Sequence, residues 1–125
     1  MKTTLELAEP LFVKWVREQI VHYSPILGLD LQVIEIEKNE TETKFLAMQN
    51  NYPYLDPMLY YHMNAVVAWN EGKLNRDRIL HELCHCITDP FFEVAISRHS
   101  SKQEILDQRE RLTDTIAAII RKLDL

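Results

Sequence analysis

Apolar side chains recur at helical spacing near both ends of the chain. Near the N-terminus they predict an amphipathic helix over residues 5–23, with an apolar face made of Leu7, Leu11, Phe12, Trp15, Val16 and Ile20. Near the C-terminus they predict a helix that begins at the capping box Ser101-x-x-Glu104 and runs to about residue 123. The apolar face expected for this last helix consists of Ile105, Leu112, Ile116, Ile119 and Leu123.

Between these helices apolar and polar residues alternate, which is typical of strands. We expect strands over residues 29–37 and 43–49, and one or two more over residues 59–69, where Tyr, Val and Trp favour extended structure. In the first of these strands the apolar residues occupy odd positions up to Val33 and even positions from Ile34. This change indicates a bulge or burial on both faces. The order of elements predicts a single α+β domain over residues 1–125, with a small, mainly antiparallel sheet.

The segment that follows these strands contains the run His81-Glu82-Leu83-Cys84-His85. It falls in a helix expected over residues 76–88, with Asn75 as its N-cap and Asp89-Pro90 as its end. The two histidines lie beyond the border of this helix's apolar stripe, which is formed by Leu80, Leu83, Cys84 and Ile87. One side of the helix is thus anchored, and the adjoining side presents both imidazoles.

These residue types at this spacing point to a zinc ion. Histidines four residues apart project from the same side of a helix, and neutral imidazole is a good zinc ligand. Glu82 lies about 100° round the helix from His81, close to such an ion but not on it. A carboxylate there can take a proton from a zinc-bound water, so one turn of helix supplies two ligands and a general base.

Composition narrows the functions to consider. A formal net charge of -5 gives no indication of nucleic acid or an anionic membrane as a partner. The two glycines, Gly28 and Gly72, lie too far apart for a glycine-rich phosphate loop, and no apolar run has the length of a membrane span. Cys84 and Cys86 point about 160° apart on a helix, so we expect two small buried apolar residues in a cytoplasmic protein and no disulfide.

A catalytic zinc needs a third protein ligand and one open position. The metzincin arrangement requires Gly and then His after the second histidine, and it fails because Thr88 and Phe91 stand at those positions. The stretch Glu110-Arg111-Leu112-Thr113-Asp114 instead places a glutamate four residues before an aspartate, 25 residues after His85 and within the last expected helix. Thermolysin-like enzymes, the gluzincins, complete their zinc site with this pattern.

The chain therefore resembles the gluzincins, with these motifs over residues 59–123, and in size and element order it is similar to a minimal, zincin-like member of that family. The resemblance implies Zn²⁺ as cofactor. It implies that the metal ligands are His81, His85 and Glu110. It also implies that Asp114 accepts the other N–H of a ligand histidine and so fixes the orientation of that ring.

The same resemblance implies that the chain hydrolyses peptide bonds, with Glu82 as the catalytic general base. A peptide or protein substrate is expected to add as a strand to an edge strand before the zinc helix, at residues 65–69. In full-length gluzincins a histidine or tyrosine of a C-terminal domain stabilises the oxyanion. We expect no such domain after Leu125, and spacing selects no substitute among Tyr60, Tyr61, His62 and His99.

Alternatives remain open for the third ligand and for the function. His99 is the second candidate for the ligand, as in SprT-like metalloproteases, and Glu104 and Asp107 are more distant ones. A helical wheel places Glu110 about 140–180° from the apolar stripe, as on a solvated face, although the small Ala117 extends the same face and lets another helix approach. The rival functions are a non-catalytic, zinc-stabilised protein-interaction domain and a metal-free interaction module with a coincidental motif.

Overall fold

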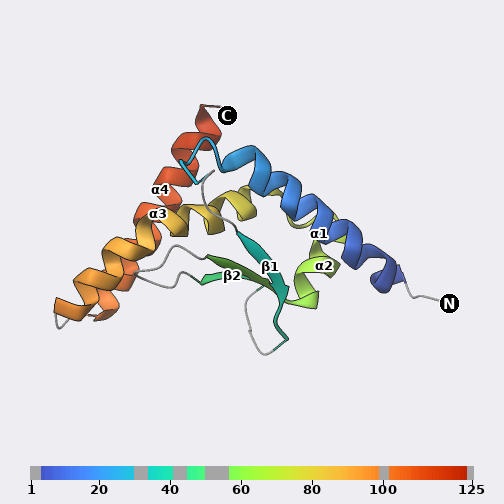
Figure 1. The fold of residues 1–125 in the computed structure, drawn as a ribbon, viewed down its shortest axis with the longest axis horizontal. Coiled ribbons are helices and arrows are strands. Elements are labelled where there is room, and N and C mark those ends of the chain that lie inside the picture. The colour runs from blue at the N-terminus through green and yellow to red at the C-terminus, as the bar shows by residue number, and fades with distance from the viewer. Residues whose placement is uncertain (1–3, 30–33, 41–44, 50–56, 99–101, 124–125) are drawn as a thin grey trace.

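The computed structural model describes residues 4–29, 34–40, 45–49, 57–98 and 102–123. In chain order these residues form α1 (Thr4–Tyr23), β1 (Glu35–Lys38), β2 (Leu46–Gln49), β3 (Met58–Tyr61), α2 (Met63–Asn70), α3 (Arg76–Arg98) and α4 (Lys102–Lys122) (Figure 1). The expected α+β class is confirmed. Figure 1 shows α3 crossing above the small sheet, with its start beside α1 and its later part beside α4.

The sheet is mixed, so the expectation of a mainly antiparallel sheet is wrong. Its strand order is β1-β3-β2, with β1 parallel and β2 antiparallel to the central strand β3. Along the chain the edge strand β2 comes before the central strand β3. Strand β3 then lies beside β1 and runs in the same direction. This topology leaves β2 at an edge of the sheet, where it also contacts α3.

Residues 63–70 form the helix α2, where strands were expected. His62 supplies the N-cap, because its Nδ1 accepts a hydrogen bond of 3.0 Å from the backbone N–H of Asn64. Burial of Ala65, Val66 and Ala68 stabilises the helix against its neighbour α1 and outweighs the preference of Val and Trp for strands. Residues 65–69 therefore cannot form the expected edge strand, and the edge strands of the sheet are β1 and β2.

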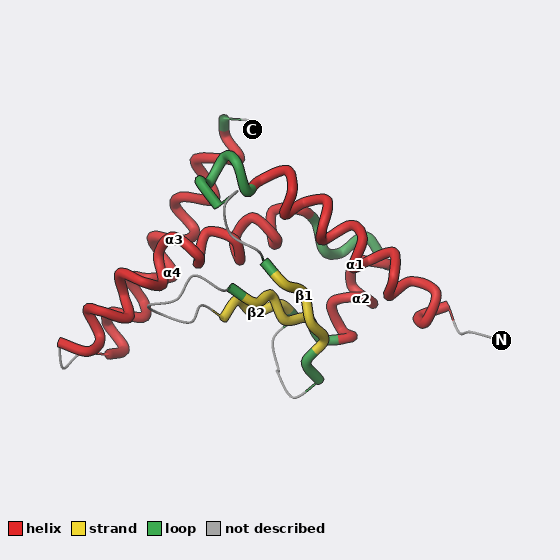
Figure 2. The backbone as a smooth tube through the Cα atoms, viewed as in Figure 1, coloured by secondary structure: helices red, strands yellow, loops and turns green. Residues whose placement is uncertain are grey.

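The helix α3 continues through Pro90 to Arg98, so the expected end at Asp89-Pro90 is wrong. A proline inside a helix removes one backbone hydrogen bond and costs about 3 kcal/mol. Figure 2 shows α4 lying beside α3 along this extension, and the packing of the two helices offsets that cost. At the other end of α3, Asn75 is the expected cap, since its Oδ1 accepts a hydrogen bond from the backbone N–H of Asp77 at 3.0 Å.

The hydrophobic core joins α1, α2, the sheet and the first half of α3. Phe12 of α1 meets Tyr61 and Trp69 edge to face, at ring-centroid distances of 5.4 and 5.8 Å. From α3 the core receives Ile79, Leu80, Leu83 and Cys84. Leu80, Leu83 and Cys84 of the expected stripe are therefore buried and fix the start of α3 against the rest of the fold, whereas Ile87 is only partly buried.

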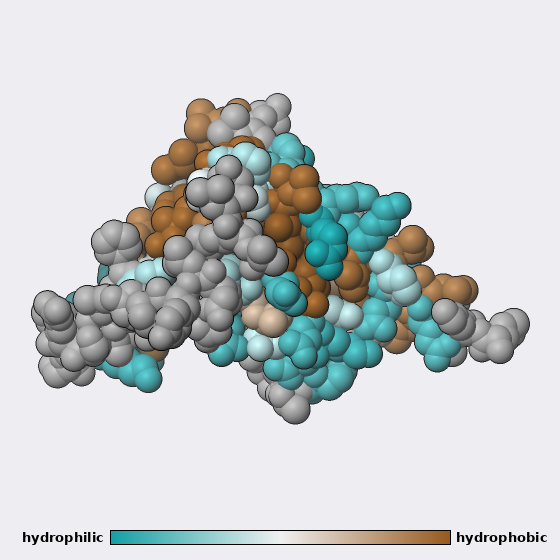
Figure 3. Space-filling model, in the orientation of Figure 1, coloured by the Kyte–Doolittle hydropathy of each residue, from teal (hydrophilic) through white to brown (hydrophobic). Residues whose placement is uncertain are grey.

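The apolar face of α4 differs from the expected one. The buried residues of this helix are Thr113, Ala117 and Ile120. The expected stripe is largely open to solvent, with Leu112, Ile119 and Leu123 exposed, and Figure 3 shows apolar surface along α4. The face of α4 that is buried therefore carries two small side chains, Thr113 and Ala117, and the larger Ile120. No described helix is long and apolar enough to cross a membrane.

This orientation of α4 predicts opposite outcomes for two neighbouring isoleucines. Ile120→Ala removes a side chain that is only 8% exposed and should lower the free energy of unfolding by about 2–4 kcal/mol. Ile119→Ala alters a side chain that is 52% exposed and should change it by less than about 0.5 kcal/mol. Urea unfolding of the two metal-free variants measures this, and equal losses would contradict the observed orientation.

Candidate metal centre

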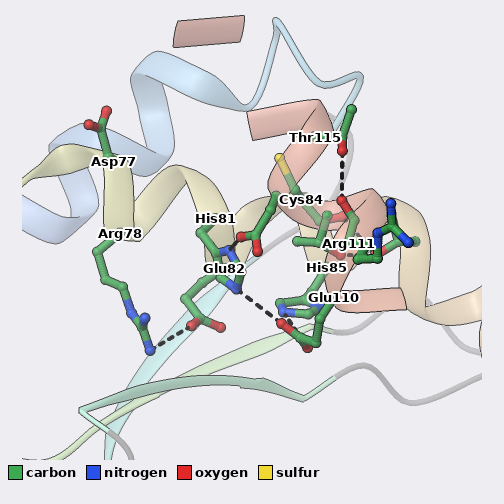
Figure 4. Close-up of polar contacts among 12 residues, drawn as sticks. Asp77, Arg78, His81, Glu82, Cys84, His85, Glu110, Arg111 and Thr115 are labelled. Atoms are coloured by element: carbon green, nitrogen blue, oxygen red, sulfur yellow. Dashed lines mark hydrogen bonds and ion pairs between the residues drawn. The ribbon is translucent and has the colours of Figure 1, made fainter. Parts of the chain in front are cut away.

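Two histidines of α3 form the first half of the site. His81 and His85 lie one helical turn apart, with ring centroids 5.0 Å apart and ring planes at 82° (Figure 4). His85 is buried and His81 is partly exposed. Leu80, Leu83 and Cys84 on the adjoining side of the helix are buried in the core and hold this turn of α3 in place.

A buried contact between two threonines brings α4 against this face of α3. The hydroxyls of Thr88 and Thr113 lie 2.8 Å apart, and both residues are buried. Thr88 stands three residues after His85, and Thr113 stands three residues after Glu110. Residues three apart share a helix face, so this contact sets the register that carries Glu110 to the histidines.

The three expected ligands converge. Glu110 Oε2 lies 3.6 Å from Nε2 of His81, and Glu110 Oε1 lies 3.5 Å from Nε2 of His85. One ligand atom from each of the three residues lies within 4.8 Å of the others. Ligand atoms about 2.0–2.1 Å from a tetrahedral zinc are about 3.3 Å apart, so these separations fit a single Zn²⁺ ion.

Each histidine is oriented by an aspartate on its other nitrogen. Nδ1 of His81 lies 2.7 Å from Oδ1 of Asp114, as expected. Nδ1 of His85 lies 2.8 Å from Oδ1 of Asp89, a partner that sequence analysis missed because it interpreted Asp89 as part of a helix end. These contacts hold both Nε2 atoms toward Glu110, as metal-binding histidines require. The signal was present, since Asp89 follows His85 by the same four residues that separate Glu110 and Asp114.

Charge around His85 favours its protonated form. Burial acts to lower the pKa of His85, but the hydrogen bond and charge of Asp89, together with the charges of Glu82 and Glu110, outweigh burial and raise this pKa. The pocket is therefore built for a positive charge at this point. A metal cation and a proton satisfy the same carboxylates, and they compete for the same ring.

Glu82 is buried beside the histidines, with only 4% of its surface exposed. Burial raises the pKa of its carboxyl group, and the charges of His85, Arg78 and His81 oppose this rise without cancelling it. A guanidinium nitrogen of Arg78, one turn earlier on α3, lies 3.5 Å from Oε1 of Glu82 (Figure 4). A carboxylate whose pKa is raised is a stronger base than an ordinary carboxylate.

Arg109 is a second residue of the site that the sequence motifs do not single out. Its Nε lies 3.8 Å from Oδ1 of Asp89, and its Nη2 lies 3.4 Å from Oε1 of Glu110. The guanidinium therefore bridges a ligand carboxylate and a histidine-orienting carboxylate. Nothing in its sequence position distinguishes it from Arg111, which is exposed on the same helix.

The site opens into a cleft of about 970 Å³. One wall is the edge strand β2, through Leu46, Ala47 and Met48, and the other walls are α3 and α4. Glu110 and Asp114 are the more exposed members of the site, while His85 and Glu82 lie at its base. The cleft therefore gives solvent and small solutes access to the space between the three ligand atoms.

Other candidates for the site lie elsewhere or are not described. Tyr60 and His62 do not line the cleft, and the hydroxyl of Tyr61 donates a hydrogen bond to Glu9 at 2.9 Å. Asp107 and Glu104 do not belong to the ligand group, and His99 lies outside the described residues. Burial raises the pKa of the thiols of Cys84 and Cys86 to about 11 and about 12, as expected for small buried residues rather than metal ligands.

Comparisons with protein-family models, with curated proteins and with solved structures gave no match for this chain. The geometry of the described residues is therefore the basis for assigning a function.

The role of Asp89 can be tested through metal affinity. Asp89→Asn should weaken Zn²⁺ binding by about 10–100-fold, because the ring of His85 loses its charged partner. Competition with a chromophoric chelator measures the affinity. Asp107→Asn is the matched control, since Asp107 is exposed and bonded to Gln103, and an equal loss in both variants would refute the role of Asp89.

The burial of Glu82 predicts a stability effect in the metal-free protein. Because the pKa of Glu82 is raised above its ordinary value of 4.5, ionisation destabilises the fold as pH rises from 4.5 through the folded pKa. Glu82→Gln should therefore be more stable than wild type at pH 7, and the gain should vanish below pH 4.5. Thermal unfolding in chelator at several pH values measures it; exposed Glu18→Gln should show no such difference.

Proposed function

We propose that this chain is a zinc-dependent metallopeptidase of the gluzincin type. The observation that carries the proposal is the convergence of His81, His85 and Glu110 at ligand spacing, in an open cleft. Three protein ligands with a free position are typical of catalytic zinc, whereas structural zinc sites are closed by four. The proposal assigns the metal to Zn²⁺ because two imidazoles and one carboxylate suit this ion.

In this proposal a zinc ion would polarise the scissile carbonyl and lower the pKa of the attacking water. Glu82 takes a proton from that water and delivers it to the leaving amine. Its burial among charged partners keeps its carboxylate in place for both transfers. Asp89 and Asp114 keep the two imidazoles aimed at the cleft through both steps.

The substrate in this proposal is an extended peptide that lies along β2. This strand is at an edge of the sheet, and it forms a wall of the same cleft that holds the ligand group. Unpaired backbone groups of an edge strand can bind a peptide as an additional strand. A peptide bound along β2 would lie in the cleft that Glu82 also lines.

One observation favours a second candidate, the non-catalytic zinc-stabilised interaction domain. None of Tyr60, Tyr61 and His62 lines the cleft, so none of them is placed to stabilise an oxyanion. In that case the metal would hold α3 and α4 together, and the cleft would bind a partner without cleaving it.

Glu82→Gln separates the two candidates. It should keep one zinc per chain and lower peptide hydrolysis by at least about 100-fold, because the general base is lost while the ligands remain. Digestion of casein and of a peptide library, beside metal analysis of the same samples, measures both quantities. Glu18→Gln on α1 is the control and should leave hydrolysis unchanged. Equal hydrolysis by wild type and Glu82→Gln, or none by either, would overturn the peptidase proposal.

A further inference from the structure

A second hollow lies beside the metal cleft at the start of α3. This hollow has a volume of about 420 Å³ and is lined by Phe45, Lys73, Leu74, Asn75 and Arg78. Asn75 and Arg78 also line the metal cleft, so the two hollows are adjacent. Figure 4 shows the guanidinium of Arg78 on the side of Glu82 that faces away from Glu110. A ligand that extends past Glu82 along the cleft therefore reaches this hollow next.

The charge of the hollow is opposite to that of the chain. The whole protein has a formal net charge of -5, and the metal cleft is lined by five carboxylates, those of Asp77, Glu82, Asp89, Glu110 and Asp114. The described lining of the second hollow contains two cations and no carboxylate. Its apolar part is Leu74, which is buried, and Phe45, which is exposed. Such a surface suits a group with an apolar stem and a negative end.

Both cations have capacity for an incoming anion. Within the described part of the chain, the charged partner of Arg78 is Glu82, whose oxygen lies 3.5 Å from one of its nitrogens. A guanidinium has five N–H donors, so most of its donors remain for a ligand. Lys73 pairs with Glu71 at 3.0 Å, but the two side chains are 73% and 49% exposed, and such exposed pairs contribute little.

The other charges near the cleft do not block this hollow. Asp77, which stands beside Arg78 in sequence, lines the metal cleft and pairs with Arg121 at 3.6 Å. A guanidinium nitrogen of Arg78 lies 3.5 Å from Oε1 of Glu82. Because an extended peptide advances about 3.3 Å per residue, a group bound by the remaining donors of Arg78 belongs to a residue one or two positions from the scissile bond.

We propose that the hollow lined by Lys73 and Arg78 is a specificity subsite for a carboxylate one or two residues from the scissile bond. This inference rests on the proposed peptidase function and narrows its substrate class to acidic peptides. The carboxylate belongs either to a Glu or Asp side chain or to the C-terminus of a short peptide. Arg78 binds it with paired N–H donors, as guanidinium groups do, and Lys73 adds a second positive charge.

The test uses zinc-loaded full-length protein and quenched fluorescent peptides that carry Glu, Gln or Lys at each of two positions on either side of the bond. Each peptide is made with a free and with an amidated C-terminus, which separates the two sources of the carboxylate. We expect Glu or a free C-terminus at one position to raise kcat/KM by about tenfold over its neutral counterpart. Equal rates for all charges at every position would overturn the inference.

A charge reversal then assigns the preference to the hollow. Lys73→Glu should lower the ratio of kcat/KM for Glu peptides to that for Lys peptides by about tenfold or more. Lys14→Glu makes the same change in net charge on the exposed surface of α1 and should change the ratio by less than about twofold. An unchanged ratio in Lys73→Glu, or an equal change in both variants, would refute the subsite.

Measuring peptide binding separately from cleavage distinguishes a failure of the subsite from a failure of the peptidase proposal. Fluorescence anisotropy of labelled peptides on the zinc-loaded protein does not require cleavage. Charge-selective binding without hydrolysis would support the subsite and overturn the enzyme. Hydrolysis without charge selectivity would leave the enzyme and overturn the subsite. Non-selective binding without hydrolysis would overturn both.

Discussion

The buried contact between Thr88 and Thr113 is the constraint on which the site depends. Two hydroxyls in a helix–helix interface must pair with each other or with the backbone, because an unpaired buried hydroxyl costs about 1–3 kcal/mol. Here they pair with each other at 2.8 Å, while each also lies near a carbonyl one turn earlier on its own helix. Sliding α4 by one residue would break this arrangement and carry Glu110 away from the histidines. Polar pairing between the helices thus gives the ligand group its register, and the small side chain of Ala117 allows the close approach.

In the site, each nitrogen of the two histidine rings faces a carboxylate, and one guanidinium lies between two of these carboxylates. The two Nε2 atoms face Glu110, the two Nδ1 atoms face aspartates, and Arg109 lies between Asp89 and Glu110. Without these partners, the neighbouring carboxylates of Asp89, Glu110 and Asp114 would repel one another. Asp89, Glu110 and Asp114 therefore each lie beside an imidazole or a guanidinium group. Glu82 is buried beside the same histidines and pairs with Arg78.

The parts of this structure that sequence analysis predicted are those that depend on local spacing. A separation of four residues on one helix places His81 beside His85, and the same spacing predicts that Glu110 and Asp114 share a face. The parts that it missed depend on packing between elements. Val66 and Trp69 favour strands by themselves, yet burial against α1 makes them helical. A proline such as Pro90 normally ends a helix, but α3 packs against α4 and continues beyond it. Asp89 therefore lies within the helix, one turn after its partner His85. The most hydrophobic stripe of α4 was expected to be buried, but the contact with α3 selects Thr113 and Ala117 over Leu112 and Ile119.

All the groups that converge on the candidate metal come from two successive helices, between His81 and Asp114. The sheet forms one wall of the cleft and α1 packs in the core, but no described residue of either belongs to the ligand group. Assembling the ligands therefore requires only the closure of the chain between His85 and Glu110, and the entropy of closing a loop rises slowly with its length. The pairing of β1 with β3 joins residues 23 apart, such as Glu35 and Met58, and is a separate closure of the chain. The donor set is thus confined to two helices that follow one another in the chain and pack side by side.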